Sequence, residues 1–155
     1  MKTLVPPLIL LLAFLGGCAQ VMNSDSGPQI INAQSAQRLH LRDWDLKDLA
    51  VAGHQIVIDV DTRITVRFGA DGQVMGFAAV NRLTGTYRLS ADGRLTWGNA
   101  GIVTTRKAGP PELMQKEKAF LSALAKINAA VIAGHTLILQ SDDSSVVLTF
   151  AEAGY

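Results

Sequence analysis

Few residues in this chain could perform acid–base or nucleophilic chemistry. The sequence holds three histidines (His40, His54 and His135) and one cysteine, Cys18. Nucleophilic catalysis needs an activated Ser, Thr or Cys beside a positioned base. No G-x-S-x-G or H-E-x-x-H motif is present,. His54 and His135 each follow a glycine at an expected strand start, where a turn or exposed position explains them. We therefore predict no catalytic residues, no cofactor and no enzymatic activity.

Two pairs of aspartates are candidates for cation binding. Asp59 and Asp61 are two residues apart, so on a strand they would project from the same face. Such a pair can bind a cation or serve acid–base chemistry. Asp142 and Asp143 lie among serines. The alternatives are a solvated strand end for the first pair and an ordinary turn for the second. Because no third oxygen-rich cluster lies near Asp59 in the sequence, we predict no metal site.

Cys18 stands at the end of a hydrophobic leader. Met1-Lys2 is a short basic start, and an apolar run from Leu4 to Leu15 follows it. This run is shorter than the roughly 20 residues that span a membrane as a helix, and it has the form of a secretory leader. The sequence Leu15-Gly16-Gly17-Cys18 then gives way to polar residues. It resembles the bacterial lipobox, although Gly16 is less usual there than Ala or Ser.

The lipobox resemblance implies cleavage after Gly17 and lipidation of Cys18. Acyl chains contribute about 0.8 kcal/mol per buried CH₂, so several chains keep such a protein on its membrane. Ala19 and Gln20 follow the cysteine, without the Asp that marks inner-membrane retention in enterobacteria. We therefore expect a lipid-anchored protein of the bacterial cell envelope, at the outer membrane and facing the periplasm. The alternative is a soluble exported protein with a free thiol.

The composition after the leader indicates a tether and then one folded domain. Residues 19–37 are rich in Ser, Asn, Gln, Gly and Pro, which is typical of a flexible linker. Ile30 and Ile31 within it could add locally to a sheet edge. The predicted divisions are a signal peptide (residues 1–17), a tether (18–38) and a domain (39–155).

The charge of the chain gives no indication of a nucleic-acid partner. There are 14 Lys and Arg residues against 13 Asp and Glu residues. Lys2 belongs to the leader, so the remainder has no formal net charge. Nucleic-acid binding and attraction to an acidic membrane surface both need a basic patch. We expect neither partner surface.

Two strand–turn–strand units with similar centres organise the domain. Residues 67–74 (RFGADGQV) recur as residues 88–95 (RLSADGRL). Asp-Gly between alternating runs indicates a hairpin, because Gly takes positive φ without steric cost and Asp hydrogen-bonds its own turn. In residues 64–68, apolar and polar residues alternate, which is typical of an antiparallel sheet with one buried face.

The segment between the two hairpins holds a candidate corner. Asn81 and Gly85 are expected to bracket a bend there. Asn tolerates left-handed geometry and can satisfy backbone groups with its side chain. We therefore interpret Asn81 as a structural corner rather than a ligand-binding residue. Arg82 is a long cation at this bend and the first candidate for a surface role, although its aliphatic stem could simply cover apolar sheet.

The remaining elements are further strands and one helix. Strands are expected within residues 39–49, at 55–60 and in a last hairpin of 136–140 with 146–150. Residues 101–109 are expected to form a connector. A helix is predicted over 111–130, with an apolar stripe for the core. The pattern predicts an α+β domain.

Between Leu39 and Phe150, a set of residues stands in a characteristic order and spacing. It comprises Trp44-x-Leu46, Ile64-x-Val66-x-Phe68-x-x-Asp71-Gly72-x-Val74-x-Gly76, Asn81-Arg82-x-x-Gly85-x-Tyr87, Thr105 before the helix, Phe120-Leu121-x-x-Leu124 on it and Gly134-x-x-Leu137-x-Leu139 after it. The set resembles the META/HslJ domain of bacterial envelope proteins. The resemblance implies a small, mostly antiparallel curved β-sheet of several hairpins packed against one α-helix. We interpret its motif residues as structural.

The sequence departs from this family's pattern at two positions. Relatives often carry cysteine just before the Asn-Arg pair and in a Met-Ala-Cys segment before the helix. Here those positions are Val80 and Gly109, and the methionine is Lys107. The joint absence suggests the hypothesis that Val80 and Gly109 face each other. A Cα separation far above about 7 Å would contradict it, because a disulfide could not bridge that distance.

The functional expectation follows from the predicted cellular location and from the resemblance to the META/HslJ domain. The resemblance implies a link to heat-shock or envelope-stress responses, altered resistance to a hydrophobic antibiotic, and no established enzymatic activity. We expect a non-enzymatic, lipid-anchored protein whose domain binds a protein, peptide or envelope component. One alternative is a periplasm-facing hydrolase or other enzyme with an unrecognised site. Another is a structural accessory of an envelope complex that uses an exposed sheet edge for strand addition.

Overall fold

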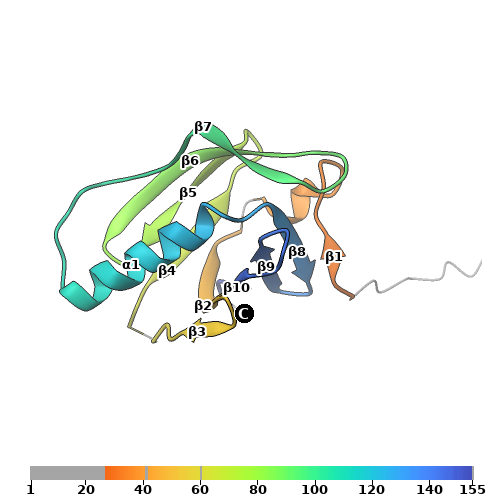
Figure 1. Cartoon of the computed structure of the whole chain (residues 1–155). Helices are drawn as coiled ribbons and strands as arrows, with labels where there is room; N and C mark the ends of the chain where they lie inside the picture. Colours follow the sequence, from red (N-terminus) through yellow and green to blue (C-terminus); the bar gives the residue numbers. More distant parts are fainter. Residues whose placement is uncertain (1–26, 41, 60, 155) are drawn as a thin grey trace, which may run out of the picture.

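An antiparallel β-sheet curls around an α-helix in the computed structural model of this chain (Figure 1). The structure describes residues 27–40, 42–59 and 61–154. The predicted signal peptide (1–17), the cleavage after Gly17, the lipidation of Cys18 and the tether as far as residue 26 lie outside the described residues. Within the described ranges, no helix is long and apolar enough to cross a membrane.

In the described residues, ten strands form the sheet, and each pairs with its neighbours in antiparallel fashion. They are β1 (Gln29–Ile30), β2 (Trp44–Val51), β3 (His54–Ile56), β4 (Ile64–Phe68), β5 (Gln73–Ala78), β6 (Asn81–Leu89), β7 (Leu95–Thr104), β8 (Ala129–Ala133), β9 (Thr136–Gln140) and β10 (Val146–Glu152). The spatial order is β1-β8-β9-β10-β2-β4-β5-β6-β7, and β3 pairs with β2. The helices are a short 3-10 turn, η1 (Ala36–Arg38), and α1 (Pro111–Leu124). The α+β class is confirmed, with a larger sheet than several hairpins.

The two Asp-Gly hairpins form as predicted, β4 with β5 and β6 with β7. Gly72 and Gly93 have φ of +78° and +88° in the turns. The Asp71 carboxylate accepts a hydrogen bond from the Gln73 backbone N–H at 3.1 Å. Asp-Gly is used here because the turn needs positive φ and a local acceptor.

The core lies between the concave face of the sheet and α1. Figure 1 shows α1 crossing the hollow of the sheet in front of β4 and β5. Phe120 and Leu124 of α1 are fully buried, as are Phe68 of β4 and Phe150 of β10. Burying each such side chain contributes roughly 1.5–3 kcal/mol, which explains the apolar stripe on the helix.

The predicted helix end is wrong, because α1 stops at Leu124 and not at Ala130. Residues 129–133 form β8, which pairs with β9 from Ala129↔Gln140 to Ala133↔Thr136. The alanines favour a helix locally. Tertiary contacts override that preference, since Ala130 and Ile132 alternate into the core.

The central segment also differs from expectation. Gly85 lies inside β6, and the chain turns instead at Ala79, whose φ is +67°. Asn81 is the first residue of the strand after this turn. Residues 101–104 extend β7 rather than forming a connector. The strands are longer than predicted because a bulge between Gly85 and Tyr87 lets β6 and β7 stay paired beyond the hairpin,.

The folded domain starts before Leu39. Gln29 and Ile30 pair with β8, and Ile31 is fully buried. The Ile31 backbone N–H donates to the Ala130 carbonyl at 2.8 Å. The tether prediction therefore does not hold for residues 29–38. The addition to a sheet edge considered for Ile30 and Ile31 does occur, at Gln29–Ile30.

Candidate functional site

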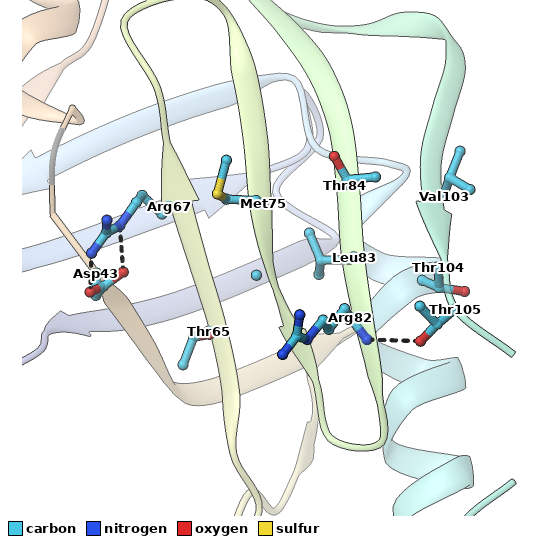
Figure 2. Close-up of a pocket in the computed structure, with 11 residues that line it drawn as sticks. Asp43, Thr65, Arg67, Met75, Arg82, Leu83, Thr84, Val103, Thr104 and Thr105 are labelled. Carbon is cyan, nitrogen blue, oxygen red and sulfur yellow. Dashed lines mark hydrogen bonds and ion pairs between the residues drawn. The ribbon is translucent and has the colours of Figure 1, made fainter. Parts of the chain in front are cut away.

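A trough lies on the face of β4–β7 that points away from α1. Cross-strand pairing places Arg67, Met75, Thr84 and Val103 in one row, because Arg67↔Met75, Met75↔Thr84 and Thr84↔Val103 are partners. Residues two apart on a strand share a face, so Thr65 and Arg82 face the same way as this row. Figure 2 shows these side chains together over the strands.

The trough has a volume of about 650 Å³. Its lining comprises Asp43, Thr65, Arg67, Met75, Gly76, Arg82, Leu83, Thr84, Val103, Thr104 and Thr105. The hollow forms because short threonines stand beside the longer side chains of Arg67, Met75 and Arg82. Its size falls within the roughly 300–1,000 Å³ that small-molecule sites occupy.

The apolar part of the trough is exposed to solvent. Met75 is 48% exposed and Val103 is 51% exposed. They are two of the four large hydrophobic side chains that stand exposed in the described ranges, the others being Ile30 and Val57. Thr84 lies between Met75 and Val103 in the row. Two exposed apolar side chains thus flank the threonine of β6, and together they form a strip across β5, β6 and β7.

One cation of the trough is already neutralised. The Arg67 guanidinium donates from Nε to Oδ1 of Asp43 at 2.7 Å, and its Nη2 donates to the other carboxylate oxygen. This bidentate pair holds the pKa of Asp43 below its usual value and raises the pKa of Arg67,. Arg67 and Asp43 together bring no net charge to the trough.

The second cation, Arg82, has an unengaged head. Its backbone N–H donates to Thr105 Oγ1 at 3.2 Å, and its carbonyl accepts from the Thr105 N–H at 3.0 Å. The strand position of Arg82 is therefore fixed. Its guanidinium is exposed and has no hydrogen-bond or ion-pair partner in the described part of the chain. Figure 2 shows the side chain extending from β6 across the trough.

A buried polar network holds the end of β6 that carries Arg82. Glu117 of α1 accepts hydrogen bonds from the backbone N–H groups of Val80 and Asn81 at 3.2 and 2.8 Å, and from Asn81 Nδ2 at 2.8 Å. Asn81 Oδ1 accepts from Thr105 Oγ1 and from the Lys107 N–H, both at 2.7 Å. Asn81 thus joins the β5–β6 turn, the segment after β7 and the helix.

Glu117 was not among the residues predicted for a site. An acid on the apolar stripe of a helix is the sequence signal that could have identified it. A buried carboxylate needs several donors. The three donors to Glu117 come from Val80 and Asn81, in the β5–β6 turn and at the start of β6, so the helix sequence alone does not reveal them.

The other motif residues have structural contacts. Trp44 is fully buried and donates to the Leu39 carbonyl at 3.3 Å. The Tyr87 hydroxyl donates to the Gly69 carbonyl and contacts His40 Nε2, each at 2.9 Å. Burial and the nearby Asp71 charge raise the pKa of Tyr87 to about 12. Only Gly76, Arg82 and Thr105 of the motif residues line the trough.

Two motif glycines mark close approaches between strands. A Cβ on Gly76 would lie 2.0 Å from the Thr65 carbonyl oxygen, and one on Gly85 would lie 2.9 Å from the Gly101 carbonyl oxygen. Real Cβ atoms do not approach backbone so closely, so each position requires glycine.

The prediction that Val80 and Gly109 face each other is confirmed. A Cβ on Gly109 would lie 3.4 Å from Val80 Cβ. Adding a Cα–Cβ bond of about 1.5 Å at each end keeps the Cα separation below about 7 Å, within the reach of a disulfide.

Three of the four aspartates considered for cation binding, Asp59, Asp142 and Asp143, have other partners. Asp59 accepts from Lys116 Nζ at 2.6 Å and also from the Thr62 hydroxyl. Asp142 pairs with Arg94 at 3.1 Å. Asp143 accepts hydrogen bonds from Ser141 Oγ and the Ser145 N–H, which lower its pKa to about 2. Across residues 27–40, 42–59 and 61–154, no three His, Cys, Asp or Glu side chains cluster to hold a metal ion.

The three histidines lie at separate places in the fold. His40 contacts Tyr87, and His54 is exposed at the start of β3. His135 Nδ1 lies 2.9 Å from Glu152 Oε2, and Arg42 also pairs with Glu152 at 2.5 Å. None of them lines the trough.

Comparisons with known proteins place this fold in a family. A model of the META domain matches residues 37–154. An NMR structure of a protein from Burkholderia xenovorans is 27% identical with a TM-score of 0.66, over 83% of this chain and 93% of that one. A crystal structure of a DUF4847 family protein from Bacteroides vulgatus is 12% identical with a TM-score of 0.56, over 75% of this chain and 95% of that one, and shows the fold alone. A search of curated proteins found no match.

Proposed function

The chain belongs to the META domain family, and on that premise we propose that it is a lipid-anchored protein of the bacterial cell envelope whose domain binds an envelope component in the trough. The observation that carries this proposal is the unengaged guanidinium of Arg82 beside the exposed side chains of Met75 and Val103. An exposed apolar strip with one oriented charged group is the usual composition of a binding site.

The proposed cellular location rests on the sequence of the leader. A hydrophobic run that ends in Leu-Gly-Gly-Cys supports cleavage after Gly17 and lipidation of Cys18. With Ala19 and Gln20 next, we propose the outer membrane, with the domain facing the periplasm. The META/HslJ resemblance supports a role in heat-shock or envelope-stress tolerance and in resistance to a hydrophobic antibiotic.

We propose that the domain binds its ligand in the trough without catalysing a reaction. The lining of the trough holds neither a histidine nor a cysteine, so no base of the usual kind stands beside its threonine hydroxyls. The neutralised Arg67–Asp43 pair and the free Arg82 head suit recognition of charge and shape.

The strand-addition alternative is less well supported. β1 and β7 are the end strands of the sheet. The start of β7 is nevertheless covered, because the Leu95 N–H donates to the Asn128 carbonyl at 2.7 Å and Arg94 bridges to Ala129. Along β7, an incoming strand would find only the later part open.

Site-specific photocrosslinking in intact cells tests the binding role. A photoreactive phenylalanine would replace Met75 or Val103 in the trough, and Val57, an exposed apolar residue outside it, would be the matched control. We expect adducts from both trough positions and none from Val57. The trough adducts should persist with Cys18→Ala, because recognition does not depend on the anchor. Equal labelling at all three positions, or none in the trough, would overturn the binding role.

The proposed lipid anchor has a separate test. Mass spectrometry of the protein purified from membranes should show a chain that begins at Cys18 and carries acyl groups. A free thiol or an intact leader would overturn the anchor without affecting the trough.

A further inference from the structure

We propose that the trough takes a free single-chain amphiphile with one negative charge, a medium-chain carboxylate, with its head on Arg82 and its tail along Met75 and Val103. This inference rests on the proposed binding function and names the ligand class of that same site.

The charge of the ligand follows from the lining. Asp43, Arg67 and Arg82 are its charged residues. Arg67 and Asp43 neutralise each other in an ion pair, so Arg82 contributes the one uncompensated positive charge of the lining. A planar guanidinium matches a carboxylate with two parallel hydrogen bonds. A ligand with a single carboxylate therefore complements the trough, and a cation does not.

Threonine hydroxyl groups in the trough can also bind the carboxylate head of the ligand. Thr65 and Thr84 line the trough on the face of Arg82, and no hydrogen bond of their side chains is found among the described residues. A threonine hydroxyl can donate to a carboxylate oxygen. Thr65 lies beyond the Arg82 head in Figure 2, and Thr84 lies on the strand of Arg82. Polar partners for the second carboxylate oxygen are therefore close to the cation.

The tail direction follows from the strand register. Met75, Thr84 and Val103 are cross-strand partners on β5, β6 and β7. With strands about 4.8 Å apart, the strip from Met75 to Val103 is roughly 10 Å long. Arg82 stands two residues along β6 from Thr84, about 7 Å from this strip. The head and the tail of one short amphiphile can therefore contact both regions at once.

The dimensions also favour a free ligand over a bilayer lipid. A volume of about 650 Å³ suits a single chain,. The polar pair of Arg67 and Asp43, each about half exposed, borders the same face. Inserting this face into a bilayer would desolvate both charges, whereas a free amphiphile leaves them in water.

The test uses the whole mature chain, residues 18–155, with Cys18→Ser, so that neither lipid nor detergent competes for the probe. Decanoate is titrated below its micelle concentration, with decanol as the neutral probe and decyltrimethylammonium as the cationic probe. Calorimetry gives the affinity, and the ¹³C-methyl NMR signal of Met75, assigned with Met75→Leu, gives the location. We expect decanoate to shift the Met75 signal, to bind roughly tenfold or more tightly than decanol, and the cation not to bind.

Arg82→Gln supplies the decisive comparison. It should weaken decanoate binding to the level of decanol and leave decanol binding unchanged. Arg88→Gln is the matched control, because Arg88 is an exposed arginine on the same face of β6 and is not part of the trough lining. Thermal unfolding of both variants verifies that they are folded. Equal weakening by Arg82→Gln and Arg88→Gln, equal affinity for decanol, or an unmoved Met75 signal would each overturn the ligand class.

The two proposals fail in different ways. If decanoate does not bind but crosslinks still form at Met75 and Val103, the trough binds another component and only the ligand class is overturned. A peptide or protein identified in those crosslinks has the same consequence. If the crosslinks are also missing, both proposals are overturned.

Discussion

Glu117 and Asn81 are joined by two hydrogen bonds, from the Asn81 backbone N–H and from its Nδ2, each 2.8 Å from a different oxygen of the Glu117 carboxylate. Glu117 is 6% exposed and Asn81 is 2% exposed. The pair links α1 to the first residue of β6, next to Arg82. The helix and the edge of the trough are therefore joined by buried hydrogen bonds.

Asn81→Ala tests this link. The substitution removes the side-chain donor to the buried Glu117 carboxylate and the acceptor of the partly buried Lys107 N–H, and each buried group left unsatisfied costs about 1–3 kcal/mol. We expect the free energy of unfolding to fall by about 2–4 kcal/mol, measured by urea denaturation. Asn99→Ala, at an exposed position of β7, should change it by no more than about 0.5 kcal/mol. Similar effects of both substitutions would show that the network does not stabilise the fold.

Tyr87 should make stability depend on alkaline pH. Its pKa is raised from 10.0 to about 12, first by burial and then by the charge of Asp71. A group whose pKa is raised by folding contributes stability that is complete below the unfolded pKa. That contribution is lost as the pH rises from about 10 to 12.

Ultraviolet titration measures this directly. The chain has two tyrosines, Tyr87 and Tyr155. The folded protein should show one tyrosine that ionises only near pH 12, and Tyr87→Phe should remove that step. If the step remains in Tyr87→Phe, or if both tyrosines of the folded chain ionise together near pH 10, the assignment is wrong.

Val80→Cys with Gly109→Cys should form a disulfide in a chain that also carries Cys18→Ser. A Cβ at 109 lies 3.4 Å from Cβ of residue 80, close to the spacing in disulfides. We expect no free thiol under air oxidation and a gain of about 2–4 kcal/mol in the free energy of unfolding relative to the reduced form. Val80→Cys alone is the control and should show no redox dependence. Two reactive thiols in the oxidised double variant would contradict the geometry.

The accuracy of the sequence predictions depends on how local each feature is. The Asp-Gly hairpins were predictable because Gly72, Gly93 and Asp71 act within their own turns. Residues 129–133 were not, because their strand exists through its pairing with β9. For the same reason, the burial of Ile31 could not be read from a polar segment.

The trough shows the same limit. Arg82 was singled out as a cation at a bend, but it lies at the start of a long strand. Met75 and Val103 were not selected, because 28 positions separate them in the sequence. Only the register Met75↔Thr84 and Thr84↔Val103 brings them into one row. Such a register depends on the bulge after Gly85, which the alternation of residues does not reveal.

Gly76→Ala should destabilise the sheet beneath the trough. The new Cβ would lie 2.0 Å from the Thr65 carbonyl oxygen and 2.9 Å from its carbonyl carbon. Both atoms are backbone, so β4 and β5 must move apart to accept the methyl group. Overpacking of this kind costs about 1–3 kcal/mol or more, and we expect the midpoint of thermal unfolding to fall by several degrees.

Gly27→Ala is the matched control for this last prediction, because a Cβ there meets nothing within 4 Å. It should leave the midpoint unchanged. Since β4 carries Thr65 and Arg67, and β5 carries Met75, separating the two strands should also weaken ligand binding in Gly76→Ala. A midpoint for Gly76→Ala within about 2 °C of the parent chain would mean that the strands tolerate a side chain at this approach and that glycine is not required there.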